Sequence, residues 1–125
     1  MSRRAWSDMS GVELKARRLR MGYSLQDFGA DLNVRPGTVE DWEAGKRPIP
    51  EGVETDLEHL ENGFEELMSE AIFFSSWDSE EKETTLFLRV DASRTEMVAA
   101  AWAALTMKKQ VPDRTYRIVR DKPKE

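Results

Sequence analysis

The residue types that most often carry catalysis are scarce in this sequence. It has one histidine, His59, and no cysteine, which excludes a thiolate nucleophile, a zinc knuckle and a disulfide. His59 lies beside Leu60 in an acidic run, without other ligand types at metal-binding spacing, so a surface histidine is the simplest interpretation. Carboxylate pairs in the same run could act as general acid and base, but no nucleophile or pocket accompanies them. We expect no enzymatic activity, no metal and no cofactor.

Basic residues offer a different chemistry, the binding of phosphate. The net charge of -5 divides unevenly, with +2 over residues 1–49, -11 over 50–85 and +4 over 86–125. Within residues 1–22, arginines and lysines far outnumber acids, and such a cluster suits a polyanion. A solvated helix face explains the same cluster equally well.

Length and hydropathy limit the fold that must position these cations. With 125 residues, of which 39% are hydrophobic, the chain can form one modest core or two small ones in series. No apolar stretch follows the N-terminal arginines, and none approaches the roughly 18 residues of a membrane span. We expect a cytoplasmic protein with no membrane association.

Three short helices are predicted within residues 10–44. Ser10 and Glu13 have the spacing of a capping box, which predicts a first helix over about 11–21 with its arginines outside. Ser24 precedes the apolar stripe of a second helix, Asn33 suits the left-handed residue that ends it, and Pro36 suits the start of a third. Val39 and Trp42 should face inward, which makes the second and third helices a helix-turn-helix.

The segment YSLQDFGADLNVRPGTVEDWEAGKRPIP resembles the Cro and lambda-repressor class of regulators, whose motif is matched by Thr38, Val39, Trp42, Glu43, Gly45, Lys46 and Arg47. From residue 13 to about 72 the chain is more closely similar to small phage-borne regulators that accompany anti-CRISPR genes and to their uncharacterised bacterial relatives. The resemblance implies a homodimer that binds double-stranded DNA, dimerises through its C-terminal region and represses its own operon. Leu25 departs from the motif, because a phosphate-binding Gln is usual there.

The resemblance and the charges together predict the DNA contacts. The expected base contacts are Arg35, Gly37, Thr38 and Asp41. The expected phosphate contacts are Arg3, Arg4, Arg18, Arg20, Lys46 and Arg47. Trp42 is expected in the core and Glu43 in a bond to the turn or to an arginine. Carboxylates at 40 and 41 would lower affinity, and they would penalise wrong sequences more than right ones.

The next segment, residues 51–75, has an apolar repeat typical of a helix that packs along its length. Its members are Val53, Leu57, Leu60, Phe64, Leu67, Ala71 and Phe74, in strict 4-3 spacing. Asn62 and Gly63 weaken its middle, and we expect one bent helix rather than two. We interpret its acidic surface as a solvated face rather than a site for a basic partner.

The C-terminal residues predict a small α+β unit. Residues 76–84 are expected to be an acidic linker, and 85–125 a strand, a helix capped by Ser93 and Glu96, and a second strand. Such a unit leaves a sheet edge and an apolar helix face uncovered, so we expect a second copy to cover both. The expected dimer contacts are Leu86, Leu88, Met97, Val98, Ala101, Trp102 and Leu105.

The predicted fold is therefore mainly α: an N-terminal helix-turn-helix bundle over residues 1–50, completed by part of a long helix, and then a strand-helix-strand dimerisation unit. The predicted function is a sequence-specific repressor that binds an inverted-repeat operator as a homodimer. The alternative is an antitoxin-like protein that binds a partner protein as well as DNA. RNA stays open as a ligand, and the sequence leaves the operator and any effector undetermined.

Overall fold

The computed structural model describes residues 6–78, 82–89 and 91–121. It divides into two compact units, Met1–Asn62 and Gly63–Glu125, and the long helix α4 (Glu51–Phe73) contributes to both. Short helices precede α4, and strands and a further helix follow it. The expected fold class is confirmed. In the part of the chain that the structure describes, no helix has the length and apolar content needed to cross a membrane.

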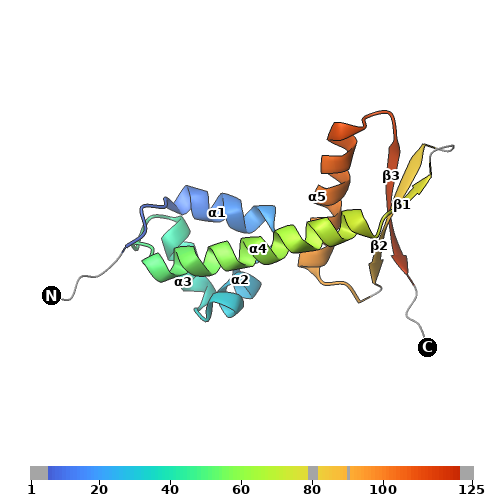
Figure 1. Ribbon diagram of the computed structural model, residues 1–125. Helices are drawn as coiled ribbons and strands as arrows, with labels where there is room; N and C mark the ends of the chain where they lie inside the picture. Colours follow the sequence, from blue (N-terminus) through green and yellow to red (C-terminus); the bar gives the residue numbers. More distant parts are fainter. Residues whose placement is uncertain (1–5, 79–81, 90, 122–125) are drawn as a thin grey trace. The chain divides into compact units, whose positions relative to one another are not determined.

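Unit 1 contains three short helices, α1 (Gly11–Arg20), α2 (Leu25–Leu32) and α3 (Pro36–Glu43), gathered against the first half of α4 (Figure 1). The hydroxyl of Ser10 accepts from the Glu13 N–H, and that of Ser24 accepts from the Asp27 N–H. Each serine thereby satisfies a backbone donor that the first helical turn leaves without a partner. These local signals explain why the first two helices begin where the sequence predicts.

The core of unit 1 is apolar and closely packed. Its buried side chains include Leu14, Met21, Phe28, Leu32, Val39, Trp42, Ile49, Val53 and Leu57. A Cβ atom at Gly11 would lie 2.4 Å from the carbonyl oxygens of both Trp42 and Glu43. Only glycine therefore allows the start of α1 to approach the end of α3 so closely.

Helix α4 is one continuous helix, which answers whether residues 51–75 form one helix or two. Its buried side chains are Val53, Leu57, Phe64 and Met68, while Leu67 is only half-buried. Phe74, the last member of the predicted repeat, follows the helix and is 68% exposed. The strict repeat was therefore wrong at its C-terminal end. A helix with 3.6 residues per turn drifts from a 3.5-residue repeat, so the buried side moves from position 67 to 68.

Unit 2 holds a three-stranded sheet in the order β1-β2-β3, formed by β1 (Ser76–Asp78), β2 (Glu83–Arg89) and β3 (Thr115–Asp121). β2 pairs parallel with β3 and antiparallel with β1. The expectation of a linker over residues 76–84 is corrected, because its two ends are strands; residues 79–81 lie outside the described part. A short edge strand tolerates the polar composition that suggested a linker.

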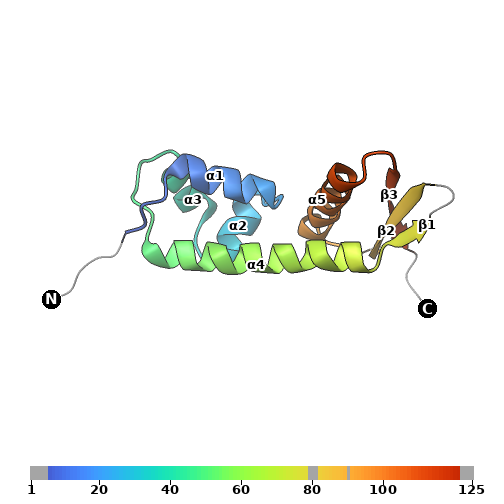
Figure 2. The ribbon, with the colours of Figure 1, turned by 45° about the horizontal axis from the view of Figure 1, so that its top comes forward.

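Helix α5 (Arg94–Gln110) connects β2 to β3 and lies over one side of the sheet (Figure 2). It begins with the predicted capping box between Ser93 and Glu96. The Tyr116 hydroxyl lies 3.0 Å from the Met107 carbonyl oxygen, so this side chain of β3 points at α5. Its partner in register, Thr84, is buried on the same face, as is Leu86.

Candidate nucleic-acid interface

The turn between α2 and α3 fixes how the third helix is presented. Asn33 ends α2 in the left-handed conformation, with φ of 59°, and the Val34 N–H donates to the Gly29 carbonyl oxygen at 2.8 Å. A Cβ atom at Gly29 would lie 2.7 Å from the Val34 carbonyl oxygen, so the turn folds directly over α2. Pro36 begins α3 with a φ already suited to a helix.

Helix α3 has one buried face and one exposed face. Val39 and Trp42 are buried, as expected of core residues. Arg35 occupies the N-cap position without a side-chain capping bond and is exposed, Gly37 is exposed, and Thr38 is half-buried. A Cβ atom at Gly37 would meet nothing within 4 Å, which leaves room there for another molecule to approach.

Arg18 does not lie with the predicted phosphate contacts. Its Nε donates to Glu43 Oε2 at 2.7 Å and its Nη2 donates to Glu43 Oε1 at 3.0 Å. A third donor, Nη1, reaches the Tyr23 carbonyl oxygen at 2.8 Å. Both charged side chains are more than nine-tenths buried. The expected bond from Glu43 to an arginine is confirmed, and the expected phosphate contact of Arg18 was wrong because its guanidinium is enclosed in unit 1.

Arg17 is also used inside unit 1, where it joins α1 to α4. It forms a two-pronged ion pair with Glu61 and donates from Nη1 to Glu13 Oε2 at 3.0 Å. The hydrogen bond to Glu61 raises the pKa of Arg17 above its ordinary range, against the opposing effect of desolvation. The sequence predicts that the arginines of the first helix lie on the outside, and this was wrong for two of the three. Arg17 and Arg18 instead hold the helices of unit 1 together.

A contact that the sequence did not indicate holds the segment before α1. The Ser7 hydroxyl donates to Glu54 Oε2 at 2.6 Å, and the Ser7 N–H donates to the Ile49 carbonyl oxygen at 2.8 Å. These bonds tie the segment to the start of α4. The predicted phosphate contacts Arg3 and Arg4 lie outside the described residues. Nothing in the spacing of residues separated by 47 positions could have identified the pair.

The exposed cations that adjoin α3 in the sequence are Arg35, Lys46 and Arg47. Arg47 Nε lies 3.3 Å from Asp41 Oδ2, and the Arg47 side chain remains 62% exposed. The Lys46 N–H donates to the Asp41 carbonyl oxygen at 2.8 Å, which brings the end of the helix back toward Asp41. Arg20 is half-buried. Of the two acids that face outward on α3, Asp41 thus has an arginine beside it, which lowers its repulsion of a polyanion.

The predicted dimer contacts differ in how deeply a single copy of the chain buries them. Leu86 is completely buried, so its expected role in a contact between subunits is corrected: it packs inside a single copy. Leu88, Met97 and Val98 are half-buried, whereas Ala101, Trp102 and Leu105 are exposed. The residues of α5 that are buried are the alanines 99, 100 and 103. The helix thus packs with its smallest side chains and exposes larger apolar ones.

Unit 2 exposes further apolar side chains that the sequence reasoning did not select. They include Phe73, Phe74, Phe87 and Ile118. Phe87 alternates with the buried Leu86 on β2 and so belongs to the other face of the strand. Strand alternation was the available signal, but it does not say which of the two faces α5 covers.

No protein-family model matches the sequence, and no curated protein is significantly similar to it. Within residues 6–78, 82–89 and 91–121, no group of three His, Cys, Asp or Glu side chains is arranged to hold a metal ion.

Proposed function

We propose that the chain is a sequence-specific DNA-binding repressor that acts as a homodimer. The observation that carries the proposal is the arrangement of Arg35, Lys46 and Arg47 around a short helix whose other face is anchored by Val39 and Trp42. Arg35 at the start of α3 has the donors to contact guanine O6 and N7, and Thr38 can contact a thymine methyl group. Such a helix suits the major groove of DNA.

The affinity would come mainly from phosphate contacts outside the reading helix. Lys46 and Arg47 follow α3 and are exposed, so they can reach the phosphate backbone of the DNA while α3 reaches the base edges. Arg20 and the N-terminal Arg3 and Arg4 would add to this set. Two subunits double the number of contacts, which compensates for the few donors on α3 itself.

The exposed face of α5 supports the proposed dimer. Trp102 and Leu105 are 38% and 56% exposed, while Ala99, Ala100 and Ala103 of the same helix are buried. Large apolar side chains grouped on a surface indicate a contact with another chain. A two-fold dimer would read an inverted repeat, with half-sites about 34 Å apart or at a multiple of that distance. A direct-repeat operator would contradict this arrangement.

Repression of its own operon is proposed from the resemblance to repressors of that kind. The test is a footprint of the purified protein on the DNA upstream of its own gene, with a scrambled duplex and an RNA of the same sequence as competitors. We expect protection of an inverted repeat, and lower expression of a reporter driven by that DNA. Equal binding to the scrambled duplex would contradict sequence-specific recognition, and stronger binding to the RNA would reassign the ligand.

The same exposed face of α5 favours one alternative, an antitoxin-like protein that covers a partner protein. The two functions differ in what accompanies the chain in its own cells. A second protein that co-purifies in equal amount and occupies α5 would support the alternative, whereas a homodimer without a companion supports the repressor.

A further inference from the structure

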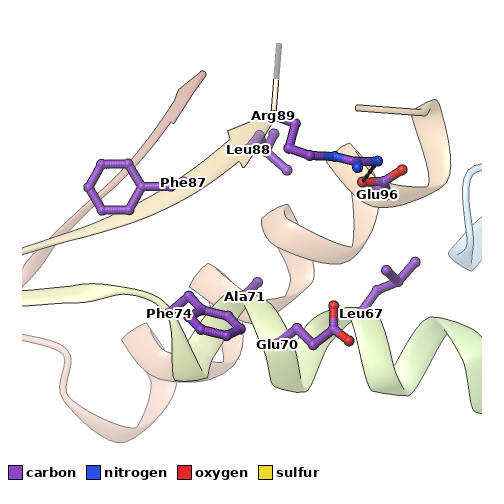
Figure 3. Close-up of a pocket in the computed structure, with 8 residues that line it drawn as sticks. All are labelled: Leu67, Glu70, Ala71, Phe74, Phe87, Leu88, Arg89 and Glu96. Atoms are coloured by element: carbon purple, nitrogen blue, oxygen red, sulfur yellow. Dashed lines mark ion pairs between the residues drawn. The ribbon is translucent and has the colours of Figure 1, made fainter. Parts of the chain in front are cut away.

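Unit 2 contains a groove of about 540 Å³ that the proposed DNA contacts do not use. Figure 3 shows Leu67, Ala71 and Phe74, from α4 and the residue after it, on one side of the groove and Phe87 and Leu88 of β2 on the other. Phe74 and Phe87 are 68% and 42% exposed. The walls of the groove are therefore apolar and accessible.

The charges around the groove are predominantly acidic. Arg89 lies 3.6 Å from Glu96, and both line the groove, so their charges offset each other. Glu70 also lines it and, among the described residues, has no ion-pair partner. Glu66 is exposed one turn earlier on the same helix. The groove therefore suits an apolar segment that carries a positive charge.

The outer face of α5 is a segment of that kind. Its exposed positions run from Ala101 and Trp102 through Leu105 to Lys108 and Lys109. These five residues, called here the α5 stripe, recur at helical spacing and pass from apolar to basic. Because α5 buries Ala99, Ala100 and Ala103, the stripe lies on the opposite, exposed side of the helix.

We propose that the groove of one copy receives the α5 stripe of a second copy, and that the contact is reciprocal. This inference rests on the proposed homodimer and specifies its interface. Leu105 and Trp102 would enter between Phe74 and Phe87, and Lys109 would pair with Glu70. Each copy provides one groove and one stripe, so a two-fold axis closes the pair with two identical contacts.

The exposed area agrees with a dimer of ordinary size. Taking about 200 Å² for a whole aromatic side chain, the exposed parts of Phe74, Phe87 and Trp102 amount to roughly 300 Å². A stable interface buries about 800 Å² on each partner. Three side chains would thus supply more than a third of it, before Leu105, Ala101 and the lysine stems are added.

Charge reversal in the full-length protein tests the pairing. We expect Glu70→Lys and Lys109→Glu each to raise the dimer dissociation constant at least tenfold in analytical ultracentrifugation, because each creates two repulsive contacts. When the two variants are mixed, both contacts of the mixed dimer become attractive. The mixture should therefore form heterodimers in preference to either homodimer, with nearly the wild-type dissociation constant. Recovery of the heterodimer also establishes that both variants fold.

The matched control is Glu58→Lys, which makes the same change at an exposed position of α4 within unit 1, and it should alter dimerisation less than twofold. A dimeric wild type whose two reversed variants show no preference for each other would overturn the groove-and-stripe interface while leaving the repressor proposal standing. A dimer weakened by Lys109→Glu and unaffected by Glu70→Lys would also overturn it, since α5 would then contact another surface. A wild type that is monomeric and still binds its operator would overturn the homodimer itself.

Discussion

Arg18 and Glu43 form a buried two-pronged ion pair, with N···O distances of 2.7 and 3.0 Å, that joins α1 to the end of α3. The third donor of Arg18 satisfies the Tyr23 carbonyl oxygen. A residue that the sequence assigned to phosphate is therefore part of the frame that orients the candidate reading helix. Its effect on DNA binding would be exerted through the fold of unit 1.

Removing either partner should leave a buried charge without a counterion. We expect Arg18→Met and Glu43→Leu each to lower the free energy of unfolding by about 3–5 kcal/mol, measured by urea denaturation. The double variant should be close to wild type, because two apolar side chains can replace a buried pair. Lys15→Met, on the exposed face of α1, is the control and should change stability by less than about 0.5 kcal/mol. A single variant as stable as this control would show that the pair contributes nothing.

This ion pair could not be predicted from local sequence patterns, whereas the starts of the helices could. Helix starts depend on neighbours three residues apart, so Ser10, Ser24 and Ser93 predicted them correctly. The pairing of Arg18 with a residue 25 positions away depends on how two helices pack, and no local pattern reports that. Glu43 could be assigned to an arginine, but the arginine itself could not be chosen.

In unit 2, the sequence did not indicate which side of α5 is buried or that β1 is a strand. Helix α5 carries apolar residues on nearly every side, so its sequence did not reveal that Ala99, Ala100 and Ala103 would be buried and Leu105 exposed. The short strand β1 was hidden by its polar residues, because an edge position does not require an apolar pattern.

Leu105 and Ala103 should respond differently to a charge, although they lie two residues apart. Because Leu105 is exposed and Ala103 is buried, Leu105→Glu should leave unit 2 folded and prevent dimerisation, whereas Ala103→Glu should unfold it. Trp102→Glu should behave like Leu105→Glu. Circular dichroism measures folding and sedimentation equilibrium measures dimerisation, so together they separate the two outcomes. If Trp102→Glu stays dimeric, α5 is not part of the interface. Leu105→Glu and Trp102→Glu should also weaken operator binding.

Arg35 is the residue expected to read a base. Arg35→Ala should reduce affinity for the operator by about 1–3 kcal/mol and relax the preference at one base position. Its effect on scrambled DNA should be small, because the lost contact carries sequence information. Lys15→Ala, a change of the same charge on the outside of α1, should leave the operator preference unchanged. Titrations of a set of operators substituted one base at a time measure this, and an unchanged base preference in Arg35→Ala would exclude the contact.

Lys46 is expected to act through phosphate alone. Lys46→Ala should weaken binding to operator and scrambled duplexes by the same factor and reduce the slope of log affinity against log salt by about one. Arg47→Ala should reduce the slope similarly. Arg18→Met should leave the salt slope unchanged under conditions in which the variant stays folded, because the Arg18 guanidinium is enclosed. A loss restricted to the operator would reassign Lys46 to base recognition.

Asp41 is expected to protect specificity, and the ion pair with Arg47 gives this role a physical form. The carboxylate holds an exposed guanidinium at 3.3 Å and repels phosphate that approaches α3 out of register. Asp41→Asn removes both effects, so affinity for scrambled DNA should rise and the salt slope should steepen by about one. On the operator the gain should be smaller, or replaced by a loss if Asp41 accepts from a cytosine N4.

The specificity ratio of Asp41→Asn should therefore fall, measured as operator over scrambled affinity at two salt concentrations. Adding Arg47→Gln to Asp41→Asn separates the two causes. If the released arginine is responsible, the double variant should lose the gain on scrambled DNA; if the lost repulsion is responsible, the gain should persist. Stability should hardly change, because an exposed pair contributes little. An Asp41→Asn variant whose specificity ratio stays the same or improves would show that α3 merely tolerates this acid.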